Sequence, residues 1–197
     1  MKRFARVCLF ILSCLSLQPA ISAEDNVTLF EFSEASAASK WQIVNDGVMG
    51  GRSTSQARIG SLESGGAVMQ FSGNLSLENN GGFASVRSRP SGSLGLEPGD
   101  TIVMRVKGDG RRYTFNLYTP DRRTAFSYQT DFDTKRGEWV EIKMPVDQFV
   151  AHSFGRPMSN MKLTPARVQA VGILLGDKKP GAFEIAIDWI QLVKERS

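Results

Sequence analysis

Beyond its first residues this chain has no cysteine, and the whole chain has a single histidine. The two cysteines, Cys8 and Cys14, lie in an N-terminal segment that we expect to be removed. Disulfides, thiolate metal sites and cysteine nucleophiles are therefore excluded together from the remainder. One histidine, His152, is too little for a zinc site, and no Gly-x-Ser-x-Gly elbow presents a serine. The sequence predicts no cofactor and a protein that is not an enzyme.

An excess of charge of one sign is also missing. The chain has 24 lysines and arginines against 20 acidic residues, and Lys2, Arg3 and Arg6 belong to the expected leader. The other 21 basic residues are interspersed with acidic ones, as on a solvated surface. The computed pI therefore does not indicate a nucleic-acid partner.

The apolar run near the N-terminus, residues 7–17, is too short for a permanent transmembrane helix. It follows basic residues and precedes a small residue, Ala23, as in an export signal. We expect a signal peptide at 1–23, a mature chain at 24–197 in the periplasm, and no stable transmembrane segment after cleavage. The alternative is a lipoprotein anchored through Cys14, which is disfavoured because Leu12 is bulky where such sites prefer a small residue.

Most of the chain alternates apolar and polar residues with a period of two, interrupted by glycine, proline, asparagine and aspartate. Only residues 33–40 predict a short helix. Strands are predicted at 67–71, 83–87, 101–107, 113–118, 124–130, 138–144, 168–175 and 183–192. Roughly nine or ten short strands without a linker or repeat predict one all-β domain, a β-sandwich or jelly roll.

Residues 108–110, Gly-Asp-Gly, predict a tight hairpin between two of these strands. We expect one face of the pair to be core and the other to be polar. The expected core face holds Ile102, Met104, Val106, Tyr113, Phe115 and Leu117. The expected polar face holds Arg105, Asn116 and Tyr118, with Arg87 and Gln129 from neighbouring strands. Such a surface suits a protein hot spot or a sugar, and the alternative is an ordinary solvated sheet face.

The densest motif is residues 41–53, WQIVNDGVMGGRS. Glycine permits positive φ and close approach, and asparagine and aspartate bond their own backbone in turns. We expect a compact loop that approaches a partner or ligand, although turn geometry alone is the alternative, and core packing is the default for tryptophan. The candidate binding residues are Trp41, Asn45, Asp46, Met49, Gly50, Gly51 and Arg52.

This motif is followed by NGGFASVR at 80–87, VKGDGRRY at 106–113 and GAFEIAIDWI at 181–190. In that order and spacing the four blocks resemble the CIA30 family, complex I intermediate-associated protein 30, over residues 30–193. The resemblance implies a galactose-binding-type jelly roll and an assembly factor or chaperone for respiratory NADH:ubiquinone oxidoreductase, with respiratory-complex subunits as protein partners. An export signal would place this chain opposite the compartment of the mitochondrial namesake, so its client can differ.

Carboxylates supply the remaining chemistry. Asp131 and Asp133 resemble the opening of a calcium loop, although Lys135 stands where a third oxygen ligand is expected. A glycosidase needs two facing carboxylates, for which Asp46, Asp109, Glu138 and Asp188 are candidates by residue type. We favour a non-enzymatic binding protein that acts through protein contacts in the cell envelope. The alternatives are a periplasmic carbohydrate-binding module and a carboxylate-dependent envelope enzyme.

Overall fold

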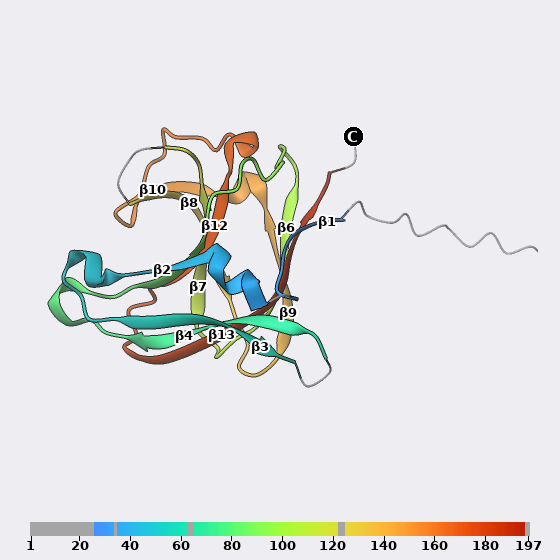
Figure 1. Ribbon diagram of the computed structural model, residues 1–197. Helices are drawn as coiled ribbons and strands as arrows, with labels where there is room; N and C mark the ends of the chain where they lie inside the picture. The colour runs from blue at the N-terminus through green and yellow to red at the C-terminus, as the bar shows by residue number, and fades with distance from the viewer. Residues whose placement is uncertain (1–25, 34, 63–64, 122–124, 196–197) are drawn as a thin grey trace, which may run out of the picture.

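The computed structural model describes residues 26–33, 35–62, 65–121 and 125–195 (Figure 1). The expected signal peptide at 1–23 and the lipoprotein alternative at Cys14 lie outside the described residues. Within them, strands are joined by turns and short 3-10 helices. No helix in these ranges is long and apolar enough to cross a membrane.

Two antiparallel sheets face each other. The six-stranded sheet contains β1 (Asn26–Glu31), β3 (Thr54–Ser61), β4 (Ala67–Leu75), β6 (Thr101–Lys107), β9 (Trp139–Pro145) and β13 (Gly181–Val193), in the order β3-β4-β13-β6-β9 with β1 also on β13. The seven-stranded sheet contains β2 (Trp41–Asn45), β5 (Ala84–Ser88), β7 (Arg112–Tyr118), β8 (Phe126–Asp133), β10 (Val150–Ser153), β11 (Arg156–Pro157) and β12 (Ala170–Leu175), in the order β11-β10-β8-β7-β12-β5-β2. The predicted all-β sandwich is confirmed.

In the described ranges, five 3-10 helices lie between strands. They are η1 (Ala35–Lys40), η2 (Asp46–Met49), η3 (Glu78–Asn80), η4 (Val146–Gln148) and η5 (Pro165–Arg167). The short helix predicted at 33–40 is thus present as η1. Its serine- and alanine-rich turn is short enough for the tighter 3-10 geometry.

The core lies between the sheets and is built from the period-two apolar faces. All six predicted core residues of β6 and β7 are fully buried. Aromatic pairs fill the space between strands: the rings of Phe71 and Phe183 meet edge to face at 5.1 Å, and those of Phe115 and Phe149 at 6.2 Å. Burying such rings stabilises each side chain by roughly 1.5–3 kcal/mol.

β13 organises the six-stranded sheet. It pairs with β4 through residues 181–187 and with β6 through residues 186–193, while β1 pairs with its C-terminal part. The ladder to β6 shifts register between Ile187 and Trp189. This irregularity leaves Asp188 without a partner in that ladder, as expected at a β-bulge.

The hairpin predicted at 108–110 is wrong. β6 belongs to the six-stranded sheet and β7 to the seven-stranded sheet, so these residues carry the chain from one layer to the other. Gly110 supplies the positive φ, 86°, of the turn. The Asp109 carboxylate accepts hydrogen bonds from the Tyr113 hydroxyl at 3.1 Å and from the Glu184 N–H at 3.0 Å. The turn is therefore fixed by contacts to both sheets and not by pairing of its flanking strands.

Phe71→Ala tests the two-sheet core. Removing this fully buried ring leaves a cavity, so we expect the free energy of unfolding to fall by about 3–5 kcal/mol in urea denaturation. The matched control is Phe154→Ala, because that ring is 62% exposed and its loss should change stability by only about 0.5 kcal/mol. Equal losses in the two variants would contradict this assignment of the core.

Candidate functional site

The motif at 41–53 forms one end of the sandwich together with the loop that precedes β5 (Figure 1). We call residues 46–53 and 76–83 the tip. β2 ends at Asn45, η2 follows, and Gly50 ends η2 with φ 89°. The Gly51 N–H then donates to the Asp46 carbonyl at 3.0 Å. The glycine-rich sequence thus folds into a closed turn.

The Asp46 carboxylate joins the two halves of the tip. It is fully buried, and its Oδ1 accepts a hydrogen bond from the Ser53 N–H at 2.9 Å. Its Oδ2 accepts from the Ser53 hydroxyl at 2.5 Å, the Gly82 N–H at 2.7 Å and the Phe83 N–H at 3.3 Å. Burial raises the pKa of Asp46, but these donors outweigh it and hold the pKa below its ordinary value of 3.8. The carboxylate is therefore an internal clamp.

Two glycines make room for this clamp. A Cβ on Gly51 would lie 2.4 Å from the Asp46 Cγ, and one on Gly81 would lie 2.7 Å from its Oδ2. Both distances are shorter than a non-bonded carbon contact. The two adjacent glycines are therefore required for different reasons. Gly50 adopts a positive φ, and Gly51 leaves space for the Asp46 carboxylate.

The clamp holds apolar side chains out to solvent. Val48 is 74% exposed, Met49 55% and, from the other half of the tip, Leu77 41%. Beside them Arg52 forms an exposed ion pair with Glu78 at 3.1 Å. The tip thus carries exposed apolar side chains on both of its halves and an exposed ion pair. Met49 belonged to the predicted site, whereas Val48 and Leu77 were missed. Val48 was signalled by its place in the glycine-rich loop, and Leu77 carried no sequence signal.

The other residues of the motif lie further inside. The Asn45 side-chain oxygen accepts a hydrogen bond from the Ser55 hydroxyl at 2.7 Å. Trp41, at the far end of β2, is 6% exposed, and its ring centroid lies 5.2 Å from that of Phe30. Trp41 has the contacts of a core side chain. The binding role of the motif stays a prediction.

A polar face lies on the outer side of the seven-stranded sheet. Gln42, Arg87, Gly172, Asn116 and Gln129 are adjacent in register across five strands. The Asn116 amide is buried and uses both of its ends, because its oxygen accepts from Ser127 and its nitrogen donates to the Thr114 carbonyl. The sheet thus brings together three of the predicted residues, Arg87, Asn116 and Gln129. A fourth, Tyr118, lies on the same face.

Tyr118 and Arg87 form the centre of the polar face. The guanidinium carbon lies 5.0 Å from the centroid of the phenol ring. Both side chains cross Gly172, where an added Cβ would lie 3.0 Å from the Tyr118 ring and 3.2 Å from the Arg87 Cγ. Burial raises the pKa of Tyr118 to about 12, and the charge of Arg87 opposes that rise. This phenol is therefore neutral at physiological pH.

Arg105 does not join this face, and that part of the prediction is wrong. β6 lies in the other sheet, where the Arg105 guanidinium forms an ion pair with Asp188 and stands 4.8 Å over the Trp139 ring. The error follows from the turn at 108–110, which crosses between the layers. The predicted alternation of core and outer residues is right for β6 and for β7. However, the outer residues of the two strands lie on opposite faces of the sandwich.

The calcium candidates lie in a strand and not in a loop. Asp133, in β8, accepts two hydrogen bonds from the Arg112 guanidinium, at 2.8 and 2.7 Å, which lower its pKa. Asp131 accepts one from the Thr114 hydroxyl at 2.7 Å. In the part of the chain that the structure describes, no three histidine, cysteine, aspartate or glutamate residues gather as metal ligands.

The carboxylates considered for catalysis have structural contacts as well. Asp46 and Asp109 accept the hydrogen bonds given above, Asp188 pairs with Arg105, and Glu138 pairs with Lys135 at 3.6 Å on the surface. His152 lies in β10, with its Nδ1 3.0 Å from the Val150 carbonyl oxygen. Each of these side chains therefore already has a partner within the fold.

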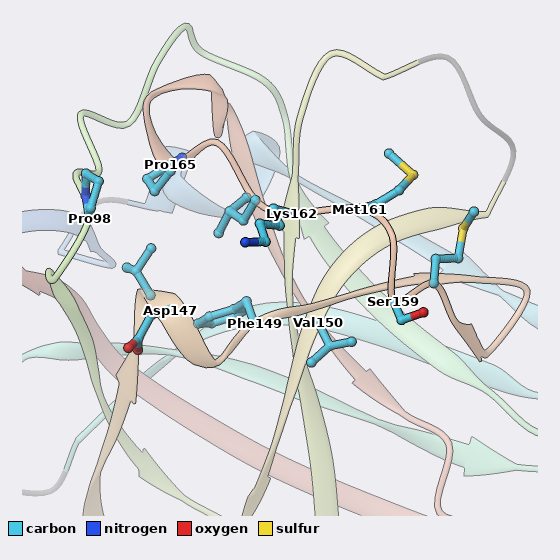
Figure 2. A pocket seen from close by; sticks show the side chains of 11 residues that line it. Pro98, Asp147, Phe149, Val150, Ser159, Met161, Lys162 and Pro165 are labelled. Carbon is cyan, nitrogen blue, oxygen red and sulfur yellow. The ribbon is translucent and has the colours of Figure 1, made fainter.

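An apolar hollow of about 430 Å³ lies beside η4 (Figure 2). Phe149 and Val150 border it from one side, and the segment with Met161 and Lys162 from the other. Its remaining lining is mostly apolar, including Pro98, Val146, Met158, Leu163 and Pro165. It offers few groups that could orient a polar substrate.

Asp46→Asn tests the clamp. An amide places a donor where backbone and hydroxyl donors converge, so we expect a loss of about 1–3 kcal/mol in the free energy of unfolding at neutral pH. Because the folded-state pKa is lowered, the carboxylate stabilises the fold above 3.8, and this contribution is lost as pH falls through the folded-state pKa. The gap between wild type and variant, measured by urea denaturation across pH, should therefore shrink in acid.

The control for that series is Asp147→Asn, since Asp147 is exposed and has no hydrogen bond or ion pair among the described residues. It should follow the wild-type curve within about 0.5 kcal/mol. A gap for Asp46→Asn that is constant from neutral to acid pH would contradict the lowered pKa.

Comparison with known proteins gives the family. Residues 30–187 match the family described as Complex I intermediate-associated protein 30 (CIA30). Two relatives called "Complex I intermediate-associated protein 30, mitochondrial" are each 28% identical to the chain, one from Mus musculus over 88% of it and one from Drosophila melanogaster over 83%. The chain spans 58% and 62% of the lengths of these relatives.

Solved structures show the same fold at low identity. A family 11 carbohydrate-binding module from Clostridium thermocellum, in complex with a β-1,3-1,4-mixed-linked tetrasaccharide, matches with a TM-score of 0.64 at 17% identity, covering 87% of this chain and 97% of the module. A family 30 module from the same organism matches with a TM-score of 0.57 at 12% identity, covering 87% and 99%. The architecture is thus the predicted jelly roll, and the chain belongs to the CIA30 family.

Proposed function

We propose that this chain is a non-enzymatic binding protein that assists the assembly of respiratory complex I through protein contacts. The choice of complex I as the client rests on the family and on the names of its mitochondrial relatives. The observation that carries the proposal is the tip, where a buried carboxylate holds Val48 and Met49 in solvent. Exposed apolar side chains on a rigid frame are typical of a docking surface.

The rigidity of the tip favours binding. Its two halves are fixed by four hydrogen bonds to Asp46 before any partner arrives, so less conformational entropy is lost on association. The thioether of Met49 adapts to irregular apolar surfaces. The ion pair of Arg52 with Glu78 lies at the margin, where charges set orientation more than affinity.

The polar face extends this docking surface. β2 and β5 run from the tip, where Asn45 pairs with Ala84, to the row that holds Gln42 and Arg87. Among the described residues Arg87 has no ion pair, and its buried Nε has no hydrogen-bond partner. A cation stacked on tyrosine, without a carboxylate of its own, suits an acidic side chain of the client. Tip and polar face together offer an apolar anchor beside a charged one.

The tip is tested by capture of the client. The double variant Val48→Ser with Met49→Ser, in the tagged full chain, should recover complex I subunits from gently solubilised envelope at least about tenfold less well than wild type. Its melting temperature should not change, because both side chains are exposed. Recovery is measured by quantitative mass spectrometry.

The control is Val27→Ser, because Val27 is 47% exposed on β1, outside the tip. It should capture the same subunits as wild type. If the wild-type chain recovers no complex I subunit, the proposed client is wrong. If the tip variant recovers as much as wild type, the proposed docking surface is wrong.

We further propose that the chain acts in the cell envelope, after export. Support comes from the basic and apolar pattern of residues 1–23. N-terminal sequencing of the protein from a periplasmic extract should begin at Glu24. An uncleaved N-terminus in the cytosolic fraction would contradict this location. A lipidated N-terminus at Cys14 would agree with the envelope but contradict cleavage before Glu24.

A further inference from the structure

A hollow of about 630 Å³ on the outer face of the six-stranded sheet takes no part in the proposed function. One row of side chains crosses it: Gln70 of β4, Ala186 of β13, Lys107 of β6 and Trp139 of β9 are neighbours in register. Ala186 carries only a methyl group between longer side chains. The hollow therefore has a low floor at Ala186, with the indole on one side and the amide on the other.

The indole of Trp139 has a charged neighbour on its own sheet face. The Arg105 guanidinium lies 4.8 Å over the Trp139 ring, and the same guanidinium forms an ion pair with Asp188. Asp188 can form this ion pair because the register shift in β13 leaves it without a partner residue in the ladder to β6. Trp139 is half-buried and lines the hollow, so this chain of contacts orients an aromatic surface toward it before a ligand arrives.

Polar groups converge on the same hollow. Among the described residues no hydrogen bond or ion pair engages the Gln70 amide, the Lys107 ammonium or the Glu184 carboxylate. By contrast the Asp109 carboxylate, on the wall, is used internally. Lys107 and Arg136 balance Glu184 and Asp109, so the lining has no net charge. The free groups can both donate and accept hydrogen bonds.

We propose that this hollow binds a sugar ring of a neutral oligosaccharide. A sugar ring has a C–H face that contacts an aromatic ring, and a rim of hydroxyls that both donate and accept. The lining matches each part, with Trp139 for the C–H face and Gln70, Glu184 and Lys107 for the rim. A charged ligand would need a charge excess, and an apolar one would cover polar groups without partners.

The test uses the full mature chain and a panel of neutral oligosaccharides: cellotetraose, maltotetraose, xylotetraose, mannotetraose and chitotetraose. Isothermal titration should give saturable binding to at least one of them. Trp139→Ala should weaken that binding at least about tenfold, and Glu184→Gln several-fold. Ala186→Leu fills the floor of the hollow while keeping every proposed contact residue, so it should abolish binding. Melting temperatures show whether each variant is folded.

The double variant Val48→Ser with Met49→Ser is the control, and it should bind the sugar as wild type does. Ala186→Leu should in turn capture complex I subunits as wild type does, so the two proposals fail separately. Absence of binding to every member of the panel at millimolar concentration would overturn the sugar site. Binding that survives both Trp139→Ala and Ala186→Leu would also overturn it.

Discussion

The buried carboxylate of Asp46 is the contact on which the tip depends. Four donors, three of them backbone N–H groups, converge on it from two segments that are far apart in sequence. A carboxylate only accepts hydrogen bonds, so it can satisfy all of these donors without presenting a proton of its own. Its desolvation is offset by the same donors, as the lowered pKa shows. The turn of η2, the two glycines and the exposure of Val48 all follow from this arrangement.

The two-layer architecture decides which polar residues work together. The turn at 108–110 takes the chain from one sheet to the other, so Arg105 and Tyr118 end on opposite sides of the sandwich. Each then finds a partner of the complementary kind. Arg105 stacks on Trp139, and Tyr118 lies under Arg87. The same type of contact, a guanidinium on an aromatic ring, thus organises both outer faces, with apolar packing between them.

The sequence predicted what is local and missed what is long-range. Each of the eight alternating segments contains a strand within the described residues, because burial of one face imposes a period of two. Five strands of the described residues were not predicted: β1, β2, β3, β10 and β11. The edge strand β2 and the half-exposed β1 carry too little alternation, and β10 and β11 have only four and two residues. β3 was missed although its burial alternates. Pairing was also beyond reach, since β13 meets β4 and β6 over long separations. The same division holds at the site: glycine and aspartate predicted the loop at 46–53, but nothing in the sequence indicated its hydrogen bonds with Gly82 and Phe83.

The architectural and the functional explanations of the 41–53 motif therefore belong together. Asp46, Gly50 and Gly51 are explained by hydrogen bonds, positive φ and space, and none of these residues needs a ligand. Val48 and Met49 contribute nothing to that frame, yet the frame holds them in water, where apolar side chains gain by meeting a partner. The frame fixes where these two side chains stand and leaves their identity free. The clamp thus fixes the fold of this loop without determining which side chains stand at positions 48 and 49.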